Sequence, residues 1–211
     1  MNIIKKITEL KIVPVAVIED SENSIPLGKT LMDAGLPIVE ITFRTKAAAD
    51  SILRLRKEFP NLLVGAGTIL TVQQIKDAIK AGVEFIVTPG FNPTVVDYCI
   101  KKDIVICPGI NSPSFIEWGI ERGLNHFKFF PANLSGGINM LKSFSGPYPH
   151  VKFMPTGGVT NETLIEYLKL ENVFSCGGSW LVKKDLISSK NFDEIKSRVE
   201  KALSLVNSEV K

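Results

Sequence analysis

The sequence has few of the residues that mark metal-binding and disulfide-bonded proteins. Its two histidines, His126 and His150, form no HxH or HxxxH pair, so a metal site built on imidazole ligands is poorly provided. Its three cysteines, Cys99, Cys107 and Cys176, contain no CxxC pair and leave one residue over. This pattern is typical of reduced packing thiols in a cytoplasm. We therefore expect a cytoplasmic protein that uses neither a metal nor another cofactor.

Long apolar runs and a strong charge of one sign are also missing. The N-terminal segment begins with basic residues, but charged residues and Pro14 interrupt its apolar stretch, which argues against a signal peptide and a transmembrane span. The net charge is +3, with lysine and arginine scattered along the chain, so neither nucleic acid nor a membrane is an expected partner. No linker divides the sequence. We expect one domain over residues 1–211, although two small domains would also fit.

Eight short apolar runs recur along the chain, separated by segments in which apolar residues have helical spacing. The runs lie at residues 12–18, 38–43, 62–66, 85–88, 104–107, 126–130, 151–155 and 173–176. Asn92, Ser112 and Thr160 stand where helix N-caps would be needed. Eight alternating strands and helices predict an α/β fold of the closed (β/α)8 TIM barrel type. An open doubly wound sheet is the alternative, but Gly65-Ala66-Gly67 lacks the third glycine of a dinucleotide fingerprint.

Two charged side chains are predicted to point into this barrel. In the motif HFKFFP, strand alternation places Lys128 on one face with His126 and Phe130, while the phenylalanines on either side of Lys128 face the helices. In VEITFR the same alternation directs Glu40 inward. Functional residues of such barrels lie at the carboxyl ends of the strands. Both residues occupy that region.

A carboxylate and an ammonium inside a barrel are costly unless they pair, change protonation or meet a polar ligand. A buried Glu40–Lys128 ion pair without chemistry is one interpretation. However, apolar surroundings favour a neutral amine, which can attack a ketone to form an imine, and Glu40 could transfer the protons. Breaking a carbon–carbon bond beside a carbonyl requires an electron sink, and the scarcity of metal ligands favours an iminium over a metal.

Two glycine pairs near the end of the chain predict an anion site. Thr156-Gly157-Gly158 and Gly177-Gly178-Ser179 follow the last two predicted strands, where barrels often bind phosphate through backbone N–H groups. Tight turns without a ligand are the alternative. Arg44, at the end of the second strand, could hold a carboxylate through two parallel hydrogen bonds, or could be an exposed structural arginine.

The ordered motifs VEITFRT, GAGT, TPG, CPGI, FKFFPA, PTGG and GGSWLV cover nearly the whole chain and resemble the 2-keto-3-deoxy-6-phosphogluconate (KDPG) aldolase / 4-hydroxy-2-oxoglutarate aldolase family. The resemblance implies a class I aldolase, without a metal, that forms a homotrimer. Its implied substrate is a phosphorylated 2-keto-3-deoxy sugar acid, cleaved to pyruvate and glyceraldehyde 3-phosphate, with 4-hydroxy-2-oxoglutarate, cleaved to pyruvate and glyoxylate, as a further substrate.

The same resemblance implies roles for individual residues. Lys128 would form the Schiff base and Glu40 would act as general acid and base. Arg44 and Thr68 would bind the substrate carboxylate. Pro89 and Phe130 would line the pocket, and the phosphate would be held by Thr156, Gly157, Gly158, Gly178 and Ser179.

Two loops depart from the family pattern, at Asn111-Ser112-Pro113 and Asn133-Leu134-Ser135. Both are expected at the substrate end, so the gluconate or galactonate configuration of the substrate, and the choice between phosphorylated and short unphosphorylated ketoacids, stay open at this point. Two other classes also stay open. One is a barrel isomerase or epimerase that acts on a sugar phosphate without an imine, and the other is a non-catalytic sugar-phosphate binding protein.

Overall fold

A computed structural model describes residues 3–210 as an α/β protein with entirely parallel strand pairing. A six-stranded sheet has the order β5-β4-β3-β2-β1-β9, and a three-stranded sheet has the order β6-β7-β8. The strands are β1 (Ile12–Ala16), β2 (Ile38–Thr42), β3 (Leu63–Gly67), β4 (Phe85–Val87), β5 (Val105–Cys107), β6 (Gly109–Ile110), β7 (His126–Phe129), β8 (Lys152–Pro155) and β9 (Cys176–Gly178). The predicted α/β class with a parallel sheet is therefore confirmed.

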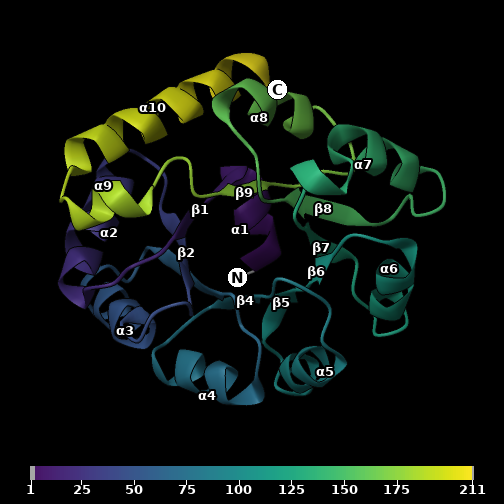
Figure 1. Ribbon diagram of the computed structural model, residues 1–211, viewed down its shortest axis with the longest axis horizontal. Coiled ribbons are helices and arrows are strands. Elements are labelled where there is room, and N and C mark those ends of the chain that lie inside the picture. Colours follow the sequence, from purple (N-terminus) through teal and green to yellow (C-terminus); the bar gives the residue numbers. More distant parts are fainter. Residues whose placement is uncertain (1–2, 211) are drawn as a thin grey trace.

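Helices surround the strands in a ring, and α1 is seen at the centre of the view in Figure 1. Apolar residues of these helices, such as Ile52, Ile75 and Ile116, are fully buried against the strands. The helices are α1 (Ile3–Leu10), α2 (Ser24–Asp33), α3 (Ala48–Glu58), α4 (Val72–Lys80), α5 (Pro93–Lys101), α6 (Pro113–Ile120), α7 (Gly137–Ser145), α8 (Asn161–Leu168), α9 (Lys184–Ser188) and α10 (Phe192–Glu209), with short 3-10 turns η1 (Ser21–Asn23) and η2 (Asn133–Ser135).

The predicted helix starts are present, but their capping bonds differ. The Asn92 side chain accepts a hydrogen bond from the Thr94 N–H (3.1 Å), as an N-cap should. Ser112 is the N-cap of α6 with an extended backbone, yet its side chain makes no capping bond. At Thr160 the backbone N–H donates to the Thr163 hydroxyl (3.0 Å).

Apart from shifts of one or two residues at their ends, the strands of the structure differ from the predicted runs at two places. The last strand begins only at Cys176, so Gly177 and Gly178 lie inside β9 and pair with Val13 and Pro14 of β1. The sequence predicted that both glycines would follow the last strand, but they form part of it. The fifth run is followed by a separate strand, β6, and the residue between β5 and β6 is Pro108, which has no N–H to continue a ladder.

The two sheets meet through single backbone bridges rather than through continuous ladders. Phe153 of β8 bridges to Val173, and Thr156 bridges to Gly177 of β9. At the other side, β5 leads directly into β6. Continuous hydrogen bonding therefore defines two sheets and not one eight-stranded sheet.

The predicted alternation of side chains along β7 is present. A Cβ added at Gly119 of α6 would overlap the ring of Phe127, and the ring of Phe129 lies edge-on to that of Phe144 in α7, with centroids 6.2 Å apart. Both phenylalanines thus pack against helices, which leaves Lys128 on the opposite face of the strand.

Candidate active site

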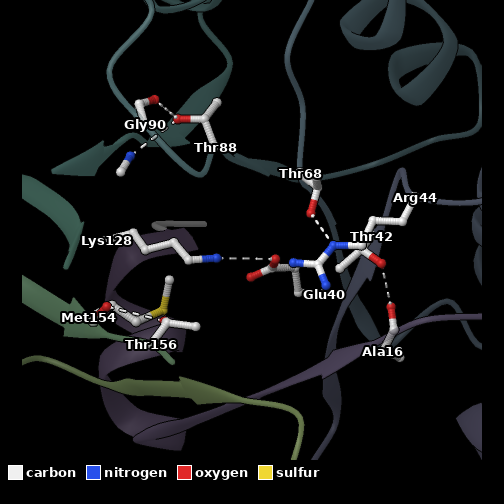
Figure 2. A network of polar contacts seen from close by, with 11 residues as sticks. Ala16, Glu40, Thr42, Arg44, Thr68, Thr88, Gly90, Lys128, Met154 and Thr156 are labelled. Carbon is white, nitrogen blue, oxygen red and sulfur yellow. Dashed lines mark hydrogen bonds and ion pairs between the residues drawn. The ribbon is translucent and has the colours of Figure 1, made fainter. Parts of the chain in front are cut away.

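Lys128 and Glu40 face each other from β7 and β2 (Figure 2). The Lys128 Nζ lies 3.6 Å from the Glu40 Oε1, and the two side chains are only 6% and 0% exposed. Within residues 3–210, neither carboxylate oxygen of Glu40 has a hydrogen-bond partner. A distance of 3.6 Å is too long for a good hydrogen bond. The pair is therefore an ion pair whose carboxylate still has lone pairs to offer to a ligand.

The surroundings of Lys128 are apolar on one side. Its Nζ lies 5.2 Å from the centroid of the Phe130 ring, which places the ammonium over an aromatic face. The buried thiol of Cys107 also interacts electrostatically with Glu40 and Lys128. Burial, together with the Glu40 charge, raises the pKa of Cys107 to about 12, so this thiol stays neutral and is not a nucleophile at neutral pH.

Hydrogen bonds around Thr88 fix the strand next to Lys128. The Thr88 hydroxyl donates to the Gly90 carbonyl (2.7 Å), as Figure 2 shows. It also accepts a hydrogen bond from the Gly109 N–H (3.2 Å). Gly109 pairs with Lys128 across the sheet, and the Lys128 N–H donates to the Pro108 carbonyl (3.0 Å). No role for Thr88 was predicted from the sequence. Its position within the TPG motif was the available signal.

Arg44 and Thr68 stand together at the ends of β2 and β3. The Arg44 Nε donates to the Thr68 hydroxyl (3.2 Å), on the same side of the site as Glu40 (Figure 2). Thr68 has a φ of 57°, a left-handed conformation that is uncommon for a β-branched residue. Arg44 is otherwise exposed, so its remaining guanidinium donors are available to an anion.

A cavity of about 640 Å³ extends from Arg44 and Lys128 to the two glycine pairs near the end of the chain. It brings together eight of the predicted site residues: Arg44, Lys128, Phe130, Thr156, Gly157, Gly158, Gly178 and Ser179. Pro89 instead lines a neighbouring cavity of about 580 Å³, and Phe130 borders both. Thr68 and Glu40 line neither cavity, but they contact Arg44 and Lys128, which line the first.

The loop after β8 has a conformation that suits glycine. Gly157 and Gly158 have φ values of 93° and 86°, which side-chain-bearing residues rarely adopt. Asn133, in the loop after β7, packs so closely that a Cβ at Gly158 would lie 2.5 Å from the Asn133 Cβ. The Asn133 N–H also donates to the Gly157 carbonyl (3.0 Å).

Eight further residues of the cavity wall were not predicted from the sequence, among them Trp180, Lys183 and Lys184. The Lys184 Nζ forms an ion pair of 2.7 Å with Glu19, in the loop after β1. For these three, the position directly after the GGS motif was the only sequence signal. Among the described residues, no group of three histidine, cysteine or acidic side chains is arranged to hold a metal ion, and none of the helices has the length and apolar character of a membrane span.

This chain matches the family model described as KDPG and KHG aldolase over residues 3–198. It is 45% identical over 205 residues to the 2-dehydro-3-deoxy-phosphogluconate aldolase of Haemophilus influenzae, which covers 97% of each chain. The crystal structure of the Legionella pneumophila KDPG aldolase, with pyruvate captured at low pH as a covalent carbinolamine intermediate, has a TM-score of 0.89 at 40% identity and covers 91% of this chain and 93% of the other. The Zymomonas mobilis enzyme with 3-phosphoglycerate has a TM-score of 0.87 at 34% identity, with coverage of 96% and 95%.

Proposed function

The chain belongs to the KDPG and KHG aldolase family, and we propose that it cleaves 2-keto-3-deoxy-6-phosphogluconate to pyruvate and glyceraldehyde 3-phosphate. It is a carbon–carbon lyase of the class I type, which uses an amine in place of a metal. One observation carries the assignment of the catalytic residues: a buried lysine amine stands 3.6 Å from a buried carboxylate that has unused acceptors.

The chemistry begins when Lys128 passes a proton to Glu40, 3.6 Å away, and the resulting neutral amine attacks the C2 ketone of the substrate to form a carbinolamine. Loss of water gives an iminium, which draws electrons from the C3–C4 bond. That bond breaks as the C4 hydroxyl loses its proton, and the aldehyde leaves. The remaining enamine takes a proton at C3, and hydrolysis of the resulting imine releases pyruvate and the free amine. The covalent pyruvate carbinolamine of the Legionella pneumophila relative supports this sequence.

Glu40 is the group that moves protons in this scheme. The protonated Glu40 carboxyl gives its proton to the carbinolamine hydroxyl, which leaves as water. The carboxylate then accepts the proton of the C4 hydroxyl and returns it to C3 of the enamine. Its complete burial keeps bulk water from competing for these protons. Among the described residues no hydrogen bond occupies its oxygens, which leaves both free for the substrate.

The two ends of the substrate are assigned to opposite sides of Lys128. Arg44, with Thr68 as its partner, binds the C1 carboxylate. The phosphate is held by Thr156, Gly157, Gly158, Gly178 and Ser179, through backbone N–H groups and the Ser179 hydroxyl. The 3-phosphoglycerate in the Zymomonas mobilis relative supports a phosphorylated ligand. Pro89 and Phe130 form the apolar wall. The shorter 4-hydroxy-2-oxoglutarate, cleaved to pyruvate and glyoxylate, is a second substrate that lacks the phosphate contact.

We further propose that the two sheets belong to one closed (β/α)8 barrel and that residues 1–211 form one domain, of which residues 1–2 and 211 lie outside the described structure. The single bridges between β8 and the β9 region support closure. The family resemblance supports a homotrimer, and the three free, buried cysteines support a cytoplasmic location. Exposed apolar side chains such as Leu70 (51%) and Ile120 (46%) provide surface for such association.

The substrate assignment is tested by measuring pyruvate release from a panel of phosphorylated 2-keto-3-deoxy acids. We expect the gluconate isomer to be cleaved faster than the galactonate isomer, and 4-hydroxy-2-oxoglutarate to be cleaved more slowly than either. Preference for the galactonate isomer would move the assignment to that substrate. Isomerisation of a sugar phosphate without pyruvate release, or binding without turnover, would contradict the aldolase assignment.

A further inference from the structure

Trp180 follows Ser179 directly and connects the end of β9 to the start of α8. Its half-buried ring lines the cavity wall and fills the space beside Gly178, where an added Cβ would overlap the ring carbons Cζ3 and Cε3. The indole therefore occupies the space that a side chain at Gly178 would need. This contact orients the Trp180 side chain relative to the end of β9.

The indole N–H reaches the other loop. The Trp180 Nε1 donates to the Asn161 Oδ1 at 2.8 Å, and Asn161 is the first residue of α8, which follows the Gly157-Gly158 turn. Gly178 ends β9 and Ser179 and Trp180 follow it, whereas Asn161 begins the helix that follows Gly157 and Gly158. This hydrogen bond therefore links the two segments assigned to the phosphate.

The backbone of Trp180 is held from a third direction. Its carbonyl accepts a hydrogen bond from the Arg198 Nη1 (3.0 Å), and the Arg198 Nε donates to Glu194 (2.6 Å) within α10. Trp180 is thus tied to α8 through its side chain and to α10 through its carbonyl. Such fixed surroundings keep the donors of a binding site in place before the ligand arrives, which lowers the entropic cost of binding.

We propose that Trp180, acting through its hydrogen bond to Asn161, is a positioning residue. It holds the two segments assigned to the phosphate, residues 156–158 and 178–179, at the spacing that a phosphate requires. The proposal rests on the function assigned above and deepens it. It makes the indole N–H, which has no part in the chemistry at Lys128, a determinant of the preference for phosphorylated over unphosphorylated ketoacids.

The test compares Trp180→Phe and Asn161→Ala with the wild-type enzyme. Trp180→Phe keeps a ring beside Gly178 but removes the N–H donor, and Asn161→Ala removes the acceptor. Each should raise KM for the phosphorylated substrate about three- to tenfold, the ratio that corresponds to one hydrogen bond. For 4-hydroxy-2-oxoglutarate, kcat and KM should stay within about twofold of wild type on the same scale of hydrogen-bond effects.

The double variant Trp180→Phe/Asn161→Ala should be no worse than either single variant, because both remove the same bond. Trp118→Phe is the matched control, since Trp118 is the other of the two tryptophans and lies on α6. Additive effects in the double variant, or an equal loss with both substrates, would overturn the proposal and leave Trp180 a packing residue.

Fluorescence gives a readout without turnover. In the Trp118→Phe background Trp180 is the sole indole, so its emission should change when inorganic phosphate is added. The affinity for phosphate obtained from this titration should fall about three- to tenfold when Asn161→Ala is added. A phosphate affinity that is the same with and without Asn161→Ala would overturn the proposal. Trapping of pyruvate on Lys128 of the wild-type enzyme tests the catalytic assignment separately. If the wild type traps pyruvate and Trp180→Phe has the same KM for the phosphorylated substrate as wild type, only the inference about Trp180 is contradicted.

Discussion

Glu40 occupies the space that a side chain at residue 67 would need. Gly67 ends β3, next to Thr42 of β2 in the sheet, and a Cβ built on Gly67 would overlap the Oε1 of Glu40. The position of the carboxylate opposite Lys128 therefore depends on a missing methyl group on the neighbouring strand. This dependence can be tested without altering either charged residue.

Gly67→Ala should displace the Glu40 carboxylate and lower kcat about tenfold or more, because general acid–base assistance is worth about 10²- to 10⁴-fold and depends on position. Gly146→Ala is the matched control, since Gly146 has a right-handed backbone and an added Cβ there meets nothing closer than 4.0 Å. Steady-state kinetics of both variants with one substrate provide the measurement. Equal kcat values for Gly67→Ala and wild type would show that the carboxylate position is not critical.

Glu40→Gln removes the acid–base group while keeping its size. We expect kcat to fall about 10²- to 10⁴-fold, with some pyruvate still trapped on Lys128, because the amine remains. In this variant the rate of pyruvate release should therefore fall much more than the extent of borohydride trapping. A near-normal kcat would return Glu40 to the role of a structural partner in a buried ion pair.

Gly158→Ala tests the anion site. A Cβ there would crowd Asn133 and sit on a backbone with a φ of 86°, so the loop must shift and its N–H donors move. KM for the phosphorylated substrate should rise, while cleavage of 4-hydroxy-2-oxoglutarate should change little. Inorganic phosphate should compete with the phosphorylated substrate. If both substrates suffered equally while the melting temperature was unchanged, the glycines would be turn formers only.

His126 gives the fold a pH dependence of its own. Burial, reinforced by the Lys152 charge, lowers the pKa of His126 in the folded protein, whereas the unfolded value is about 6.5. Just below pH 6.5 the unfolded chain then binds more protons than the folded chain, so stability falls as the pH decreases through this window. Urea unfolding at pH 5.5 and 7.5 should show a smaller loss for His126→Gln than for wild type. An unchanged or larger loss in that variant would contradict this cause.

Strand alternation was sufficient to predict which residues face each other at the centre of the site. The motifs HFKFFP and VEITFR place Lys128 and Glu40 inward because each strand has a period of two, and the structure has them 3.6 Å apart. The need for glycine at residue 67 could not be predicted in this way. It depends on the contact between two strands that are separated by a helix in the sequence.

The second glycine pair shows the same limit. Gly177-Gly178 reads locally as a turn, yet both residues lie in β9, because pairing with β1 and the space taken by Thr156 and Trp180 decide their conformation. The bonds of Thr88 to Gly109 and of Trp180 to Asn161 also join different strand–helix units. Such tertiary contacts leave no periodic signal in the sequence.

Trapping of the imine tests the central claim most directly. The enzyme is incubated with pyruvate and borohydride, digested and analysed by mass spectrometry, with Lys128→Ala and Lys184→Ala treated in parallel. Lys184 is a suitable control because it lines the same cavity but pairs with Glu19. We predict one 1-carboxyethyl group on the peptide that contains Lys128, in wild type and Lys184→Ala, and none in Lys128→Ala. Modification of a different lysine, or no modification with a folded enzyme, would contradict the assignment of Lys128 as the Schiff-base residue.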